Sequence, residues 1–146
     1  NSAFMLGFMI FSPVFAQLEH RVHRMHLMAA GLVTWSAAVL LCAASPSYAT
    51  FVLGRVLVGA GEASFVCLVP PFIDDYAPPD RRTRWLSYFY MAVPVGAAAG
   101  FAVAGPVAAH ASWRFPFLAA ALLMLPFALY VALLPKRLPA AEEEEL

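Results

Sequence analysis

The sequence predicts an all-α membrane protein, a helical bundle with about five transmembrane helices. Of its 146 residues, 62% are hydrophobic and only 12% are charged, and the mean hydropathy is +0.75. Soluble domains are about half apolar and about a quarter charged. The chain also contains five apolar stretches near the length of about 20 residues that spans a bilayer. These observations together place the chain within a membrane.

The apolar stretches follow one another with short polar connections between them. They cover residues 1–18, 27–48, 48–73, 85–109 and 115–135. Only the third contains charged residues, Arg55 and Glu62. The first stretch lacks the basic start of a secretory signal peptide and is too long to be one. Because the chain opens without methionine and inside an apolar stretch, we expect it to be a piece of a longer membrane protein.

Arginine and lysine are distributed unevenly between the two ends of the predicted helices. The connections after the first, third and fifth stretches contain Arg21, Arg24, Arg81, Arg82, Arg84, Lys136 and Arg137. The other two connections contain Arg114 alone. By the positive-inside rule, the basic connections face the cytoplasm. Because the connections are short, we expect sequential helices to be antiparallel neighbours.

The C-terminal residues differ in composition from the rest of the chain. We expect residues 1–137 to form the bundle and residues 138–146 to begin an acidic cytoplasmic linker. Four consecutive glutamates at 142–145 repel one another, which favours a solvated segment.

Arg55 and Glu62 need an explanation because a charge inside a transmembrane helix is costly. The cost for an arginine is about 2.5 to 3.5 kcal/mol on insertion scales. Seven positions make nearly two helical turns, so both side chains project from one face into the same interior space. Gly59 and Gly61 lie on or beside that face, where a substrate or a neighbouring helix can approach the backbone. We predict a substrate-binding or coupling site at these four residues; the alternative is a polar lock between helices.

The fourth stretch is rich in small residues. Gly96 and Gly100 form a G-x-x-x-G pattern within "PVGAAAGFAVAGP". Such faces let helix backbones approach closely in lipid, so we expect a helix-packing surface. Pro94 and Pro106 leave open a second interpretation, in which this helix bends.

Other classes of function find no support in the sequence. A formal net charge of +0 with dispersed cations provides no basic surface for nucleic acid. No metalloprotease motif, paired catalytic carboxylates or Ser and His dyad is present in the apolar stretches, so we expect neither an enzyme nor a cofactor. His20, His23 and His26 diverge around a helix, so we expect no metal site. These histidines belong either to an interfacial loop or to a pH-sensitive gate.

Three segments resemble a known family. "RVLVGAGEAS" at 55–64 is similar to the fourth-helix signature of the major facilitator superfamily, and of its Spinster branch in particular. "DRRTRWLSYFYMAVPVG" at 80–96 resembles the Spinster loop and fifth helix, and "SAFMLGFMIFSPVF" at 2–15 resembles its second helix. The resemblance implies a twelve-helix fold of which this chain supplies helices two to six.

The resemblance also implies a function and a place in the cell. Family members move lysolipids, such as lysophospholipids or sphingosine phosphate, by alternating access coupled to protons or another ion. In that scheme Arg55 engages the anionic headgroup or regulates protonation, and Glu62 takes part in coupling. The implied partners are membrane lipids and the remaining helices. The implied location is a lysosomal, late endosomal or plasma membrane in a eukaryote and the inner membrane in a bacterium.

The loop at 16–25, "AQLEHRVHRM", occupies the place of the superfamily's cytoplasmic gating motif. Three positions match the motif G-x-L-a-D-r-x-G-r-k: Leu18, Arg21 and Arg24. Three others depart from it, with Ala16, His20 and His23 in place of Gly, Asp and Gly. The family pattern implies that Asp75 pairs with this loop. Glu19 lies about 100° around a helix from the missing carboxylate, so we expect the lock to be absent or altered. An altered lock also favours a second reading, a non-transporting scaffold or receptor-like protein.

Introduced cysteines test the predicted topology. In full-length protein lacking Cys42 and Cys67, a cysteine replacing Ser47 should react with an impermeant maleimide only from the outside. A cysteine replacing Thr83 should react only from the cytoplasmic side. Labelling of position 47 from the cytoplasmic side alone would invert the topology.

Overall fold

The computed structural model describes residues 2–110 and 112–133, and all of its regular structure is helical. The predicted all-α fold is therefore confirmed. The helices are α1 (Ser2–Leu18), α2 (Arg24–Ala44), α3 (Tyr48–Tyr76), α4 (Arg82–His110) and α5 (Phe115–Leu133). They agree with the predicted apolar stretches within a few residues. The acidic segment at 138–146, together with Lys136 and Arg137, lies outside the described residues.

In the described ranges, three helices are long and apolar enough to cross a membrane by length and composition. They are α2, α3 and the segment of α4 at Arg82–Val107. α1 has 17 residues, which is at the lower limit for a spanning helix. The apolar part of α5, Phe115–Tyr130, is also below 18 residues. These lengths support an integral membrane protein.

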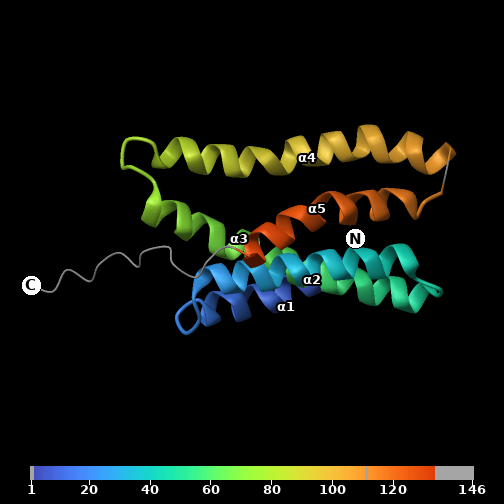
Figure 1. Cartoon of the computed structure of the whole chain (residues 1–146), viewed down its shortest axis with the longest axis horizontal. Helices are drawn as coiled ribbons and strands as arrows, with labels where there is room; N and C mark the ends of the chain where they lie inside the picture. Colours follow the sequence, from blue (N-terminus) through green and yellow to red (C-terminus); the bar gives the residue numbers. More distant parts are fainter. Residues whose placement is uncertain (1, 111, 134–146) are drawn as a thin grey trace, which may run out of the picture.

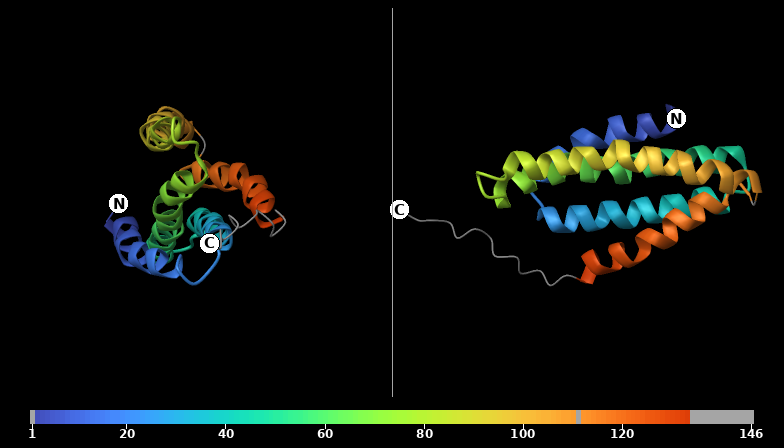
Figure 2. Two further views of the ribbon diagram at one scale, coloured as in Figure 1. Left: turned by 90° about the vertical axis from the view of Figure 1, so that its left-hand side faces the viewer. Right: turned by 90° about the horizontal axis from the view of Figure 1, so that it is seen from above.

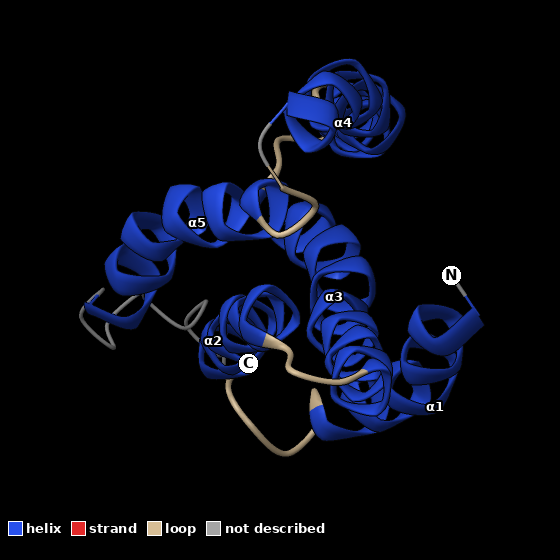
Figure 3. Cartoon of the chain, turned by 90° about the vertical axis from the view of Figure 1, so that its right-hand side faces the viewer, coloured by secondary structure: helices blue, strands red, loops and turns tan. Residues whose placement is uncertain are grey.

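α3 is the central element of the bundle. α1 packs on one side of α3, and α2 lies between α3 and α5 (Figure 3). α4 runs along the other helices but stands apart from them, as Figure 1 and the left view of Figure 2 show. The expectation that sequential helices are neighbours is therefore wrong in part. α1 packs mainly on α3 rather than on α2, and α4 makes few contacts with either α3 or α5.

Glycines explain why α3 can lie so close to both α1 and α2. A Cβ added at Gly59 would lie 2.1 Å from the carbonyl oxygen of Phe4 in α1. A Cβ added at Gly61 would lie 2.7 Å from the backbone nitrogen of Trp35 in α2. Small residues allow such backbone approach, and dispersion then holds helices together in lipid. A neighbouring helix therefore covers each of these two glycines.

This packing favours one of the two interpretations that the sequence left open for Gly59 and Gly61. Helices approach both positions, and neither glycine is among the residues that line the cavity described below. The two glycines seat α1 and α2 against α3, and a substrate-binding or coupling role for them stays a prediction.

The ends of α3 are set by local signals in the sequence. Ser47 caps its N-terminus, where its hydroxyl accepts a hydrogen bond from the Thr50 amide at 3.3 Å. The helix ends at Tyr76 because two prolines follow Ala77, and a residue before proline disfavours the helical conformation. The 29 residues of α3 correspond to about 43 Å of helix. α3 is thus long enough to join both ends of the bundle.

The small-residue face of α4 is not covered by the described helices. Nothing described lies within 4 Å of a Cβ built at Gly96 or Gly100. Packing at Gly96 and Gly100 therefore stays a prediction.

A larger side chain at Gly59 should separate α1 from α3. We expect Gly59→Leu to lower the free energy of unfolding by about 1 to 3 kcal/mol, because backbone atoms of α1 cannot move aside cheaply. Thermal unfolding of the full-length protein in detergent measures this effect. Gly105→Ala, which meets nothing within 4 Å, is the matched control. Equal stability of the two variants would contradict the packing described here.

Candidate functional site

Arg55 and Glu62 line one cavity of about 690 Å³. Their side chains therefore share one space, as the seven-residue spacing predicts. All five helices and the turn before α5 contribute to the wall, through Phe4, Met5, Trp35, Val39, Val58, Gly100, Ala104, Trp113, Pro116, Phe117 and Ala120. The remaining wall is mostly apolar, and among the described residues Arg55 and Glu62 are the only charged ones that line it.

Arg55 lies where two cavities meet. Its guanidinium carbon is 5.7 Å from the centre of the Phe4 ring in α1, within the range of a cation–π interaction. It also lines a second cavity of about 420 Å³, whose wall includes Tyr48 and Phe51 near the start of α3. Phe117 of α5 lines both cavities. A ligand can therefore approach Arg55 from either cavity.

Glu62 is half-buried and is held by α2. The Trp35 side chain forms a hydrogen bond with Glu62, and the indole N–H is the only donor on that side chain. Trp35 reaches this position because its backbone lies directly against Gly61. The sequence analysis missed Trp35, since a single tryptophan in an apolar helix is no signal for a site. Gly61 thus contributes to the site indirectly, by placing the partner of Glu62.

The cavity suits an amphiphilic ligand. A guanidinium presents five donors and binds phosphate or carboxylate in a fork geometry. The apolar walls from α1, α2 and α5 suit a hydrocarbon chain. Glu62 adds a group that carries charge only when deprotonated. The arrangement can bind a lipid-like anion beside a carboxylate that exchanges a proton.

The gating loop contains an ion-pair cluster centred on Arg24. One guanidinium nitrogen of Arg24 pairs with Asp75 at the end of α3. Another lies 2.5 Å from a carboxylate oxygen of Glu19, just after α1. The pairing of Asp75 with the loop is therefore present, and it is made through Arg24. The cluster joins the ends of α1, α2 and α3.

Glu19, which directly follows α1, supplies the loop with a carboxylate that pairs with Arg24. Only 13% of the Glu19 side chain is exposed, compared with 58% of the Asp75 side chain. Glu19 therefore provides the more shielded of the two pairings of Arg24. The sequence analysis assigned it no partner.

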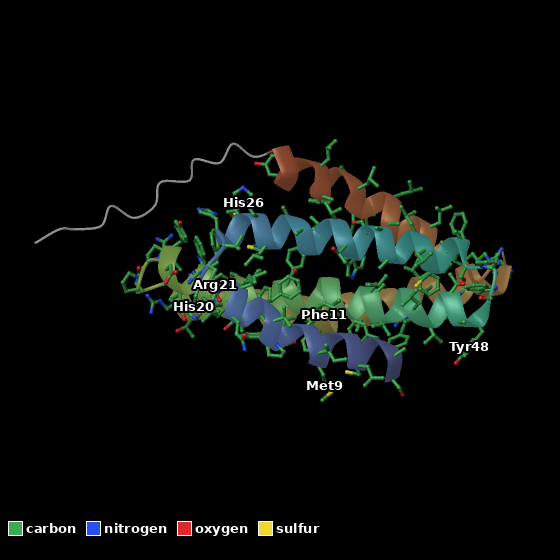
Figure 4. The ribbon with its side chains drawn as sticks, turned by 90° about the horizontal axis from the view of Figure 1, so that it is seen from below. Met9, Phe11, His20, Arg21, His26 and Tyr48 are labelled. Carbon is green, nitrogen blue, oxygen red and sulfur yellow. The ribbon has the colours of Figure 1, made fainter. Side chains whose placement is uncertain are left out.

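His20 and Arg21 have a different environment from Arg24. Both are exposed and lie together beyond the end of α1, while His26 stands on the other side of α2 (Figure 4). The rings of His23 and His26 meet edge to face, with centroids 5.6 Å apart. Within the described residues, no group of three His, Cys, Asp or Glu side chains is placed to hold a metal ion. Gating roles for His20 and Arg21 stay predictions.

A double-mutant cycle tests the shielded ion pair. For Glu19→Gln and Arg24→Gln in the full-length protein, we expect a coupling free energy of about 1 kcal/mol, the upper end for accessible pairs. The control is the Asp80 and Arg81 pair, which is 3.5 Å apart with both side chains more than half exposed. Its coupling should be near zero. Thermal unfolding of the single and double variants provides both values. A coupling free energy between Glu19 and Arg24 no larger than that between Asp80 and Arg81 would show that the Glu19–Arg24 ion pair does not stabilise the bundle.

Comparison with known proteins identifies the family of this chain. The family model described as Major Facilitator Superfamily matches residues 1–146. The chain is 47% identical over 128 residues to a protein of Arabidopsis thaliana named "Probable sphingolipid transporter spinster homolog 3", covering 88% of this chain and 24% of that protein. It is 35% identical to "Protein spinster" of Drosophila melanogaster over 79% of this chain and 19% of that protein.

A human protein extends the same similarity. The chain is 38% identical to "Protein spinster homolog 1" of Homo sapiens over 69% of this chain and 20% of that protein. The chain therefore spans about a quarter or less of the length of these relatives. Its helices, its Arg55 and Glu62 cavity and these matches agree. The chain belongs to the Major Facilitator Superfamily, and within that superfamily it is similar to the Spinster proteins.

Proposed function

We propose that this chain is part of a secondary active transporter that moves lysolipids or sphingolipid phosphates by alternating access. Transport of this kind couples the substrate to a proton or another ion. The observation that carries the proposal is that, within the part of the chain that the structure describes, Arg55 and Glu62 are the only charged residues on a mostly apolar cavity of about 690 Å³. The name of the Arabidopsis relative, "Probable sphingolipid transporter spinster homolog 3", supports a lipid-like substrate.

Arg55 is proposed to bind the anionic headgroup. It is the only cation on the cavity wall, and its guanidinium suits a phosphate. Phe4 stacks near its charged end, which leaves the guanidinium oriented by α1. The apolar residues of α2 and α5 are proposed to accommodate the acyl or sphingoid chain. In this assignment, Arg55 binds the headgroup and the apolar wall binds the hydrocarbon chain.

Glu62 is proposed to couple substrate binding to a proton. When deprotonated, it repels an anionic headgroup and attracts Arg55 through the shared cavity. Protonation removes both effects, so a proton and an anionic substrate favour each other's binding. The hydrogen bond from Trp35 holds the carboxylate towards the cavity in the meantime. The helices that complete the fold lie beyond this chain, and full transport depends on them.

The cluster of Glu19, Arg24 and Asp75 is proposed to close the cytoplasmic end. It ties three helix ends together, so opening this end requires breaking two pairings of one arginine. The alternative, a non-transporting scaffold or receptor-like protein, draws on the altered gating loop. Glu19 weakens that alternative, because it supplies a carboxylate that the altered motif omits.

Flux measurements on two variants test the proposal. The full-length protein is reconstituted in vesicles, and lysophosphatidate flux is measured across a pH series. Glu62→Gln keeps shape and hydrogen bonding but fixes the neutral state, so the pH dependence should flatten while binding persists. Arg55→Lys keeps the charge but loses the fork, so binding should weaken by about tenfold, the equivalent of about 1.4 kcal/mol.

The controls use the same preparation. Arg84→Lys, at an exposed position outside the cavity, should change neither the pH profile nor the affinity. If Glu62→Gln kept the wild-type pH profile and Arg55→Lys kept full affinity, the pair would have to be reassigned to helix packing. Absence of flux in the wild-type protein, with lipid binding intact, would favour the receptor-like alternative.

A further inference from the structure

A third cavity lies at the end of the bundle opposite the ion-pair cluster. It has a volume of about 340 Å³ and is formed between the α2 to α3 connection and the turn before α5. Its wall includes Ser45, Ser47, Tyr48, Phe51, Trp113 and Arg114. Figure 4 shows Tyr48 at this end of the molecule, remote from His20 and Arg21. By the arginine asymmetry of the sequence, this end faces away from the cytoplasm.

Arg114 is held in place on two sides. Its guanidinium carbon lies 5.1 Å from the centre of the Trp113 ring. One guanidinium nitrogen donates a hydrogen bond to the Ser45 carbonyl oxygen at 2.9 Å. A guanidinium has five N–H donors, so this contact leaves donors that can serve a ligand. The cation is thus oriented before any ligand binds.

No carboxylate of the described chain balances this charge. The described acidic residues are Glu19, Glu62, Asp74, Asp75 and Asp80, and none of them lines this cavity. Apart from Glu62, they lie at or near the cytoplasmic end, in the loops or last turns of helices. Within the described residues, an anion that enters this cavity therefore meets a cation and no competing carboxylate. Phosphate is the anion that a forked guanidinium and serine hydroxyls recognise well.

The cavity is connected to the central site by shared wall residues. Tyr48 and Phe51 line both this cavity and the second cavity, of about 420 Å³. The second cavity also contains Arg55, and Trp113 lines both the outer cavity and the central one. The rings of Phe51, Trp113 and Phe117 meet edge to face with centroids 5.7 to 6.3 Å apart. An aromatic surface thus runs from Arg114 to Arg55.

We infer that Arg114 and the Ser47 hydroxyl form an outer binding site for a phosphate-bearing lipid headgroup, from which the lipid passes along the aromatic surface to Arg55. The volume suits a headgroup, and the aromatic side chains suit the adjoining hydrocarbon. This inference rests on the proposed function, because it names a second station for the same class of substrate. It places one arginine at each station.

Ser47 allows the site to be tested without removing Arg114. Ser47 is the N-cap of α3, and both aspartate and asparagine cap helices as well as serine does. Ser47→Asp supplies Arg114 with an internal carboxylate and should expel an external phosphate. Ser47→Asn preserves the cap without the charge. The two variants therefore differ in the charge beside Arg114 and should fold alike.

The experiment measures binding of radiolabelled lysophosphatidate to purified full-length protein in neutral detergent. Arg55→Gln is introduced first, so that binding at the central site is lost and the outer site is measured by itself. In this background, Ser47→Asp should weaken binding by at least about tenfold. Ser47→Asn and the remote control Arg84→Gln should stay within about twofold. Thermal unfolding confirms that all variants are folded.

Several results would overturn the inference. One is equal binding by Ser47→Asp and Ser47→Asn, and another is the absence of any saturable binding in the Arg55→Gln protein. Displacement by inorganic phosphate as effectively as by lysophosphatidate would exclude a lipid site. Displacement by phosphatidylglycerol but not by unlabelled lysophosphatidate would exclude a station for transported lipid. Failure of the proposed function is distinguishable, since it would appear as unchanged flux in Arg55→Lys and Glu62→Gln.

Discussion

The close approach of α3 to its two neighbours is the constraint on which the other features depend. Lipid provides no hydrophobic drive for helix association, so packing relies on small residues and dispersion. Gly59 and Gly61 bring the backbones of α1 and α2 into direct contact with α3. With these two contacts in place, Arg55 and Glu62 line a cavity to which all five helices contribute. Glycine packing therefore decides where the charges point.

The charges of the chain follow the long axis of α3. Asp75, in the last turn of α3, joins the cluster at Arg24. The Oδ1 atom of Asp74 lies 3.4 Å from the Nε atom of Arg82 at the start of α4. Arg55 and Glu62 occupy its middle, and Arg114 pairs with the connection just before its first turn. Burying isolated charges is costly, and each of these groups has a charged, aromatic or hydrogen-bonding neighbour. α3 thus organises polar contacts at three depths.

Sequence predicts the architecture well because hydrophobic length and arginine placement are local properties of the chain. The five helices and the shared face of Arg55 and Glu62 follow from composition and from helical period. Trp35 and Glu19 could not be predicted, because their roles depend on which helix lies beside them and on where α1 ends. The same limit applies to Gly59 and Gly61. A glycine indicates close approach, but its neighbour is a property of the fold.

The position of α4 separates two parts of the cavity wall. α1, α2 and α3 pack tightly and hold Arg55, Glu62 and Trp35, while α4 contributes only Gly100 and Ala104 to the wall. At the start of α4, the ion pair between Asp74 and Arg82 links this helix to the end of α3. The charged pair of the proposed substrate site therefore lies on a helix that packs closely against two neighbours, whereas the part of the wall that α4 adds consists of small uncharged residues.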